Sequence, residues 1–247
     1  MLRQGNTILI TGGGSGIGQA LAHRWHDRGN TVIVVGRRAE PLEATVKDRA
    51  GMSFYLLDVA NPVENRAVTR RIMEDHPNLN VVVNNAGASF EEDARSTRDL
   101  SHAEAMVATN LLGPIRIIDA FIDHLKTKPD AAIVNVSSGV GFVPYAAAPT
   151  YSATKAAVHS YTAALRALLA GSVEVIEIIP PQVATDLLPG LKGSPYSVPL
   201  DAFADEVMTL LDEEPVSGEI VVESVKQFRF AERQGRTEEL IASMLPK

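Results

Sequence analysis

Three residues around position 150 carry side chains that could move a proton. Ser138, Tyr151 and Lys155 supply a hydroxyl, a phenol and an ammonium, and Tyr151 and Lys155 are four residues apart. On a helix this spacing places both side chains on one face. A nearby ammonium stabilises phenolate, although lowering a tyrosine pKa from near 10 by about 3 pH units requires on the order of 4 kcal/mol. The pattern predicts Tyr151 as general acid and base, Lys155 as the group that lowers its pKa, and Ser138 as the donor to a substrate oxygen. The same spacing also occurs on the surface of amphipathic helices.

A glycine-rich segment, Thr-Gly-Gly-Gly-Ser-Gly-Ile-Gly at 11–18, separates an apolar run from a stretch with helical spacing. Gly12, Gly16 and Gly18 would let the backbone turn tightly and approach a pyrophosphate, whose charge is favoured at a helix N-terminus. A glycine-rich turn without a ligand is the alternative, and the spacing differs from the common G-x-G-x-x-G fingerprint. The position after a first strand favours a dinucleotide site.

Polar and small residues follow two later apolar runs. Asp58 and Val59 come after the run at 54–57, and Ala86 and Gly87 come after the run at 81–83. Asp58 could accept a hydrogen bond from an adenine amino group, and the small residues would leave space for a ribose. Alternatively, Asp58 caps the next helix and the Asn-Ala-Gly segment is an ordinary turn.

The identity of the dinucleotide depends on the residues after the second apolar run. A carboxylate there favours NAD, whereas this chain has Gly36 followed by Arg37, which can pair with a 2′-phosphate. We therefore expect NADP(H) to be favoured and NAD(H) to remain possible.

Short β-branched apolar runs alternate with longer stretches that have helical spacing. The runs read as strands at 8–10, 31–35, 54–57, 81–83, 131–136 and 173–179. The helical stretches are 19–28, 41–50, 62–76, 101–126 and 150–170. Because the runs are continuously apolar, both faces of the sheet should be covered, which predicts an α/β, doubly wound parallel fold.

Length and composition limit the other possibilities. The 247 residues fit one domain, 1–247, and no linker or repeat divides them. A formal net charge of -7 disfavours nucleic-acid and anionic-membrane partners. The chain has no cysteine and no cluster of histidines, so we expect no catalytic metal and a cytoplasmic protein. The acidic run at 91–93 should face solvent or a loop.

Together these motifs resemble the classical short-chain dehydrogenase/reductase family over residues 7–185. The resemblance implies a single Rossmann domain with a seven-stranded parallel sheet flanked by helices, assembled as a homodimer or homotetramer. It also implies a catalytic tetrad, in which the first residue holds a water that relays protons: Asn110, Ser138, Tyr151 and Lys155.

By the same resemblance, several further residues should contact the dinucleotide. Its pyrophosphate would meet the glycine loop, its adenosine the segments after the third and fourth strands, and its nicotinamide the segment after the sixth strand. The implied contacts are Gly12, Ser15, Gly16, Ile17, Gly18, Arg37, Asp58, Val59, Asn84, Asn85, Ala86, Gly87, Tyr151, Lys155, Pro181, Val183 and Thr185. Proline at 181 replaces the family's usual glycine, which resembles the DltE-like oxidoreductase branch and restricts the backbone before a predicted mobile substrate loop at 186–200.

The predicted function is hydride transfer between NADP(H) or NAD(H) and a small ketone, aldehyde or secondary alcohol. Segments 89–92, 139–145 and 187–196 resemble the walls of the family's substrate pocket, and their mostly apolar residues favour a hydrophobic substrate. Glu91 or Glu92 could add polarity, and the same apolar residues could instead complete the core or a dimer surface. The main alternative is a catalytically silent regulator that binds the dinucleotide. A non-redox enzyme that uses the serine and tyrosine is a third possibility, although it would not need the glycine loop.

Overall fold

The computed structural model describes residues 1–213 and 218–245, so 214–217 and 246–247 of the predicted domain lie outside the described residues. Its seven strands form one sheet in the order β3-β2-β1-β4-β5-β6-β7, and every neighbouring pair is parallel. The strands are β1 (Thr7–Thr11), β2 (Thr31–Gly36), β3 (Met52–Leu56), β4 (Val81–Asn84), β5 (Ala132–Val136), β6 (Glu174–Ile179) and β7 (Glu219–Val221). The predicted doubly wound fold with a seven-stranded parallel sheet is confirmed.

Two apolar cores lie on opposite faces of this sheet. On β1, Ile8 and Ile10 belong to one core and Leu9 belongs to the other, and all three side chains are fully buried. Burial on both faces explains why the sequence shows continuous apolar runs and not alternation. The strand order reverses between β1 and β4, so a crevice forms at the carboxyl ends of these strands.

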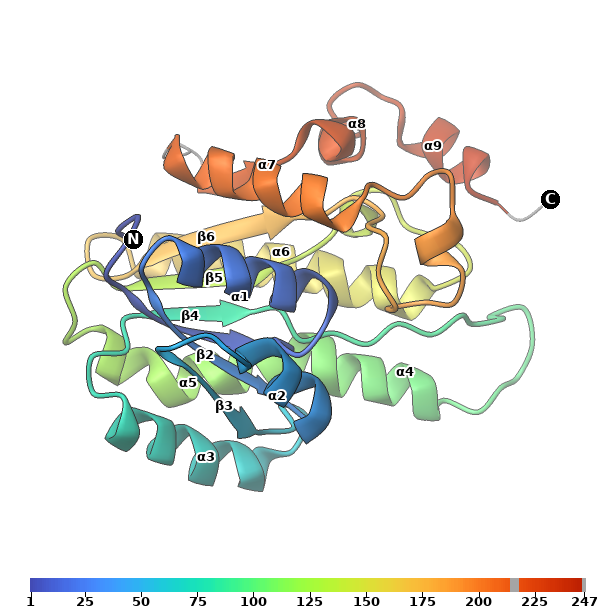
Figure 1. Ribbon diagram of the computed structural model, residues 1–247. Helices are drawn as coiled ribbons and strands as arrows, with labels where there is room; N and C mark the ends of the chain where they lie inside the picture. Colours follow the sequence, from blue (N-terminus) through green and yellow to red (C-terminus); the bar gives the residue numbers. More distant parts are fainter. Residues whose placement is uncertain (214–217, 246–247) are drawn as a thin grey trace.

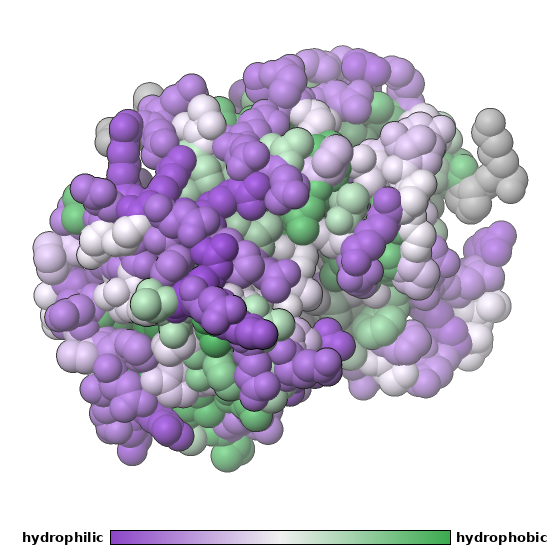
Figure 2. All heavy atoms as spheres, viewed as in Figure 1, coloured by the Kyte–Doolittle hydropathy of each residue, from purple (hydrophilic) through white to green (hydrophobic). Residues whose placement is uncertain are grey.

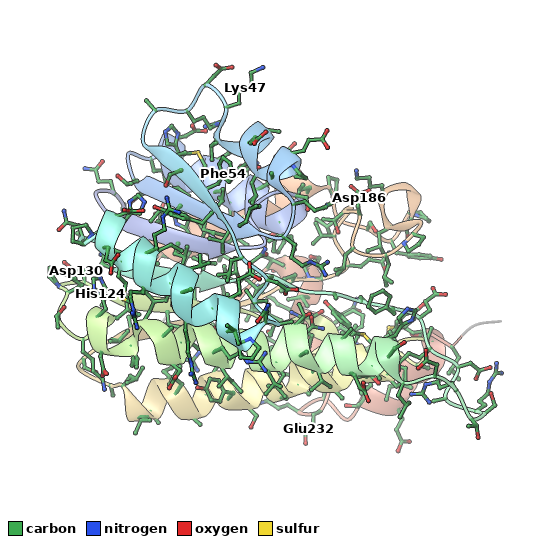
Figure 3. All side chains as sticks on the ribbon, turned by 90° about the horizontal axis from the view of Figure 1, so that it is seen from below. Lys47, Phe54, His124, Asp130, Asp186 and Glu232 are labelled. Atoms are coloured by element: carbon green, nitrogen blue, oxygen red, sulfur yellow. The ribbon has the colours of Figure 1, made fainter. Side chains whose placement is uncertain are left out.

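Helices cover both faces of the sheet (Figure 1). The first face carries α1 (Gly16–Asp27), α2 (Ala39–Val46) and α7 (Leu200–Asp212). The opposite face carries α3 (Pro62–Asp75), α5 (Gly113–Leu125) and α6 (Pro149–Leu168), which lie side by side when seen from below (Figure 3).

The predicted helix at 101–126 is interrupted in the structure. Its parts are α4 (Ser101–Met106), the π-helix η1 (Val107–Leu112) and α5, which follow one another without a loop. The wider turn includes Asn110, whose side chain is buried. Such π segments are rare and occur often at functional sites. The sequence pattern also does not identify α7 or the three-residue edge strand β7.

The C-terminal part of the chain packs behind the end of β5. It contains η4 (Glu223–Val225), α8 (Lys226–Arg229) and α9 (Thr237–Ser243), and η2 (Gly139–Gly141) follows β5. A Cβ atom added to Gly139 would lie 2.7 Å from Val225 Cγ2 and 3.4 Å from Phe228 Cβ. Val143 is fully buried in a small core with Ala231 and Leu240, so it does not line the predicted pocket wall at 139–145.

Candidate active site

The glycine-rich loop is bound to the loop that follows β4. Asn85 Nδ2 donates to the carbonyl oxygens of Thr11 and Gly12 at 3.0 and 3.3 Å. Thr11 Oγ1 accepts from the backbone N–H groups of Asn85 and Ala86, each at 3.0 Å. The Asn85 amide therefore holds the two loops together, and the Asn-Ala-Gly segment is more than an ordinary turn.

The loop leaves no space for a side chain at Gly12, Gly13 or Gly18. A Cβ atom on Gly18 would lie 2.3 Å from Gly12 O, and Gly12 and Gly16 have φ angles of 67° and 53°. Ser15 is exposed at the N-terminus of α1 and makes no capping hydrogen bond through its side chain. A backbone that approaches closely, together with the positive end of a helix, fits a pyrophosphate.

The segment after β6 reaches the same loop. A Cβ atom on Gly16 would lie 3.3 Å from Thr185 Cγ2, which places Thr185 against the glycine loop. Val183 is buried in the core and pairs with Val198 in an isolated β-bridge. From the side shown in Figure 2, the surface is hollowed to the right of centre, and pale and green residues surround this hollow.

Asp58 follows β3 and does not cap the next helix. Its Oδ1 accepts from Ala60 N at 2.9 Å, whereas Asn61 is the N-cap of α3 and accepts from Val63 N and Glu64 N. The capping alternative for Asp58 is therefore wrong. Val59 is buried beside Gly113 of α5.

Arg37 and Arg38 follow the end of β2, and both are exposed. Neither side chain forms an ion pair with any residue in the described ranges 1–213 and 218–245. A guanidinium at this position is available to an anion such as a ribose phosphate.

Tyr151 lies in the first turn of α6, and Lys155 lies one turn later. The Lys155 Nζ is 5.7 Å from the centroid of the Tyr151 ring and donates to Val136 O at 2.9 Å. Ser138 follows β5, and its Oγ accepts from Val140 N at 3.4 Å. The structure thus brings the predicted phenol and ammonium together beside the end of β5.

Burial dominates the titration of this pair. It raises the pKa of Tyr151 to about 12, against the effect of a hydrogen bond with Ser138. Burial also lowers the pKa of Lys155 to about 8, although the negative charge of Glu177 acts to raise it. For the protein by itself, burial outweighs the hydrogen bond with Ser138, and the lowering of the Tyr151 pKa by Lys155 stays a prediction. A further positive charge is needed to favour the phenolate.

Asn110 connects η1 to two other parts of the site. Its Nδ2 donates to Ala88 O at 2.8 Å and to Thr154 Oγ1 at 3.2 Å, and its Oδ1 accepts from Ala88 N at 2.8 Å. A Cβ atom on Gly87 would lie 3.6 Å from Asn110 Oδ1 and 3.9 Å from Lys155 Nζ. The four predicted tetrad residues therefore extend from elements that contact one another.

Glu92 differs from its prediction. Its side chain is only 3% exposed, and it accepts from Thr150 N and Thr150 Oγ1, each at 2.9 Å. Arg98 also donates to it at 3.1 Å. Glu92 therefore stabilises the start of α6, next to Tyr151, and does not face solvent.

The sequence-based predictions did not include four further polar residues beneath the site: Asn135, His159, Thr162 and Glu177. Asn84 Nδ2 donates to Asn135 Oδ1, and Asn135 Nδ2 donates to Thr162 Oγ1, both at 2.9 Å. Glu177 is fully buried on β6 and contacts His159 of α6. The sequence does mark two of these residues, because Asn135 and Glu177 interrupt strands that are otherwise apolar.

Comparisons with known proteins agree with this geometry. The family model for short chain dehydrogenases matches residues 6–193. The uncharacterized oxidoreductase DltE of Bacillus subtilis is 42% identical over 184 residues, which are 74% of this chain and 73% of DltE. The NADP-dependent 3-hydroxy acid dehydrogenase YdfG of Escherichia coli K12 is 30% identical over 75% of this chain and 72% of YdfG. A short chain dehydrogenase from Burkholderia cenocepacia, solved in complex with NADP, superposes over the full length of both chains with a TM-score of 0.85 and 25% identity.

Proposed function

This chain belongs to the short chain dehydrogenase family, and we propose that it transfers hydride between NADP(H) and a small carbonyl or alcohol substrate. The predicted family and its DltE-like branch are confirmed by these relatives, which are named oxidoreductases and dehydrogenases. The observation that carries the proposal is the convergence of Tyr151, Lys155 and Ser138 at a crevice that also holds the glycine loop.

NADP(H) is the favoured cofactor. The exposed Arg37 stands where the ribose 2′ position is read, YdfG is NADP-dependent, and the Burkholderia enzyme was solved with NADP. Use of NAD(H) as well stays open, since the loop offers Ser15 and no further basic residue.

Bound NADPH supplies the hydride that a carbonyl carbon receives. In that direction Tyr151 donates its hydroxyl proton to the carbonyl oxygen, and in the reverse direction it accepts the proton from an alcohol. Ser138 donates to the same oxygen, and the ammonium of Lys155 stabilises the phenolate. Asn110 holds a water that returns protons to Lys155.

Small hydrophobic ketones, aldehydes and secondary alcohols are the proposed substrate class. The loop at 186–200 carries the exposed Leu187, which we expect to contribute an apolar wall to the substrate pocket. An apolar wall of this kind favours an apolar substituent beside the reacting carbon.

Helices α5 and α6 form the proposed surface for a homodimer or homotetramer. Leu168 is 80% exposed, and a groove beside it is lined by apolar residues including Ile115, Ile122 and Tyr161. The segment Ser101–Leu125 is the one described helix that is long and apolar enough to cross a membrane. Because Phe121 and Leu125 are fully buried against the sheet, we assign this helix to the core and to the subunit contact, and we propose no membrane or nucleic-acid partner.

Tyr151→Phe tests the enzyme assignment, because it removes the transferable proton and keeps the ring. We expect turnover to fall by at least about 10²-fold while NADPH binding, followed by cofactor fluorescence, is unchanged. Turnover is measured as NADPH oxidation across a panel of aldehydes and ketones. NADPH binding without turnover of any of them by the unmodified protein would favour the regulator instead.

A further inference from the structure

A buried carboxylate lies beneath the proposed reaction site. Glu177 is fully buried on β6 and pairs in register with Asn135 of β5. An ionised carboxylate in a protein core costs several kcal/mol unless other groups compensate it. The partners of Glu177 therefore indicate what this residue does.

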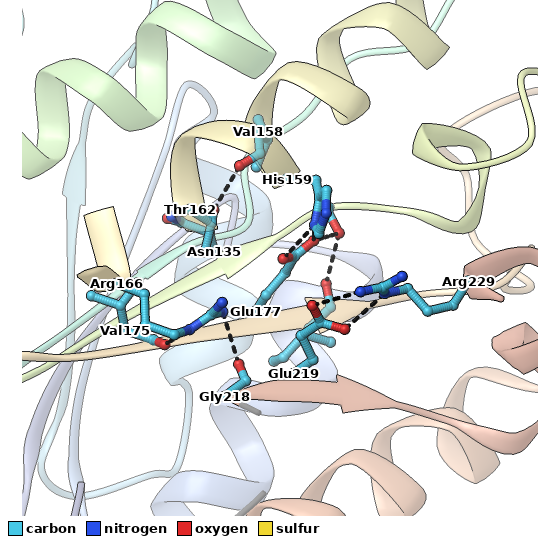
Figure 4. Close-up of polar contacts among 12 residues, drawn as sticks. Asn135, Val158, His159, Thr162, Arg166, Val175, Glu177, Gly218, Glu219 and Arg229 are labelled. Carbon is cyan, nitrogen blue, oxygen red and sulfur yellow. Dashed lines mark hydrogen bonds and ion pairs between the residues drawn. The ribbon is translucent and has the colours of Figure 1, made fainter. Parts of the chain in front are cut away.

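Two of these partners belong to the elements that carry the catalytic groups, and Figure 4 shows one of them, His159, beside Glu177. Ser137 Oγ donates to Glu177 Oε1 at 2.5 Å, and His159 Nδ1 lies 2.9 Å from Glu177 Oε2. Ser137 stands between Val136, whose carbonyl holds Lys155, and Ser138. His159 follows Lys155 by one turn of α6, so Glu177 contacts this helix one turn beyond the position of Lys155.

The other charges around Glu177 are balanced within the described residues. Arg229 of α8 donates to both oxygens of Glu219 on β7, at 2.7 and 2.9 Å, and Arg166 lies near the same carboxylate. Possible ligand atoms of His159, Glu177 and Glu219 lie within 4.8 Å of one another. Because Arg229 already supplies the positive charge at Glu219, this geometry favours an ionic network over a metal site.

We propose that Glu177 is a positioning residue of the reaction site, which fixes the strand end bearing Ser138 through Ser137 and keeps Lys155 in its ammonium form through its negative charge. The inference rests on the proposed function. The charge of Glu177 raises the pKa of Lys155 against the effect of burial, which agrees with this role. Glu177 acts through other residues and does not touch the substrate.

Glu177→Gln tests the role of the negative charge, because glutamine removes the charge but keeps the shape and an acceptor for Ser137. Glu174→Gln is the matched control, since Glu174 is exposed at the opposite end of the same strand. The readout is a pH titration of the lysine side chains by carbon-13 NMR, with Lys155→Met identifying the Lys155 signal. We expect Lys155 to titrate about one pH unit lower in Glu177→Gln and as in the wild type in Glu174→Gln. An unchanged titration in Glu177→Gln overturns the electrostatic role, and this experiment does not depend on turnover.

The kinetic arm uses benzaldehyde and NADPH. In Glu177→Gln the alkaline limb of the kcat–pH profile should shift to lower pH by about as much as the Lys155 titration, while KM for NADPH stays constant. Glu177→Asp keeps the charge and should restore the wild-type limb, and a limb that stays displaced in this variant contradicts the charge argument.

Ser137→Ala should lower kcat without moving the Lys155 titration, and unchanged kcat in this variant overturns the positioning role. If the wild type turns over neither benzaldehyde nor any other carbonyl of the panel, the proposed function fails, while the NMR titration still decides the role of Glu177.

Discussion

Lys155 combines a proposed catalytic role with a cost in stability. Burial lowers its pKa from 10.5 to about 8, so the unfolded chain binds more protons than the folded protein between these pH values. Stability should therefore rise with pH through this window, and below pH 8 the buried ammonium costs about 3 kcal/mol.

Lys155→Met should consequently stabilise the protein. After the loss of the bond to Val136 O, about 1 kcal/mol, we expect a gain on the order of 2 kcal/mol at pH 7 that disappears by about pH 10. Urea unfolding at several pH values measures this difference. Lys47→Met removes an exposed lysine instead of a buried one and should change little. A Lys155→Met variant that is no more stable than the wild type at pH 7 would contradict the assignment.

Arg37 should determine the choice between the two cofactors. Arg37→Asp replaces a partner for the 2′-phosphate by a carboxylate that suits the ribose hydroxyl of NAD. We expect the ratio of kcat/KM for NADPH to that for NADH to fall about 10- to 100-fold. Arg38→Asp places the same charge change one residue later and should have a smaller effect. Equal ratios for the two variants would show that Arg37 does not read the 2′ position.

Individual residues differed in how well the sequence predicted them. Local spacing placed Tyr151 and Lys155 on one face of a helix, and the structure has them there. It did not reveal the direction of the Tyr151 pKa shift, because burial depends on the whole fold. It also missed the contact of His159 with Glu177, because these residues meet only after α6 packs on β6.

At the scale of elements, Glu92 fixes the start of the helix that carries Tyr151. Its hydrogen bonds to Thr150 and Arg98 lower its pKa below 4.5, although burial acts in the opposite direction. A carboxyl with a lowered folded pKa stabilises the protein above its unfolded pKa, and this contribution is lost as the pH falls through the folded value.

Glu92→Gln should therefore destabilise the protein by about 1–2 kcal/mol at pH 7, since charge-assisted bonds at a helix N-terminus are lost. The difference from the wild type should shrink as the solution is acidified below pH 4. Denaturant midpoints at pH 7 and at lower pH measure it. The exposed neighbour provides a control in Glu91→Gln, which should behave like the wild type. An equal effect of both variants would argue against the capping role.

Hydrophobic pattern predicted most strands to within one or two residues, because buried parallel strands are continuously apolar. It could not predict β7, which has three residues and depends on pairing with β6. It also treated 101–126 as one regular helix, although Gly113 and Pro114 stand where the π-helical turn around Asn110 ends and α5 begins.

For the whole molecule, the exposed apolar face of α5 and α6 predicts self-association. We expect the wild type to sediment as a dimer or tetramer, and Leu168→Lys to shift it mainly to monomer, because a charge cannot be buried unpaired in an apolar interface. Val63 on α3 is about as exposed as Leu168 but lies outside this face, so Val63→Lys should leave the assembly unchanged. Analytical ultracentrifugation distinguishes these outcomes, and a monomeric wild type would refute the prediction.

The C-terminal packing behind Ser138 also has an evolutionary consequence. The family model matches residues 6–193, whereas the side chains that press on Gly139 and Val143 come from 225–240. Selection could therefore exchange this tail, which packs against the turn after Ser138, while the proton-transfer groups stay intact. Descendants with new specificities would then diverge first in the tail.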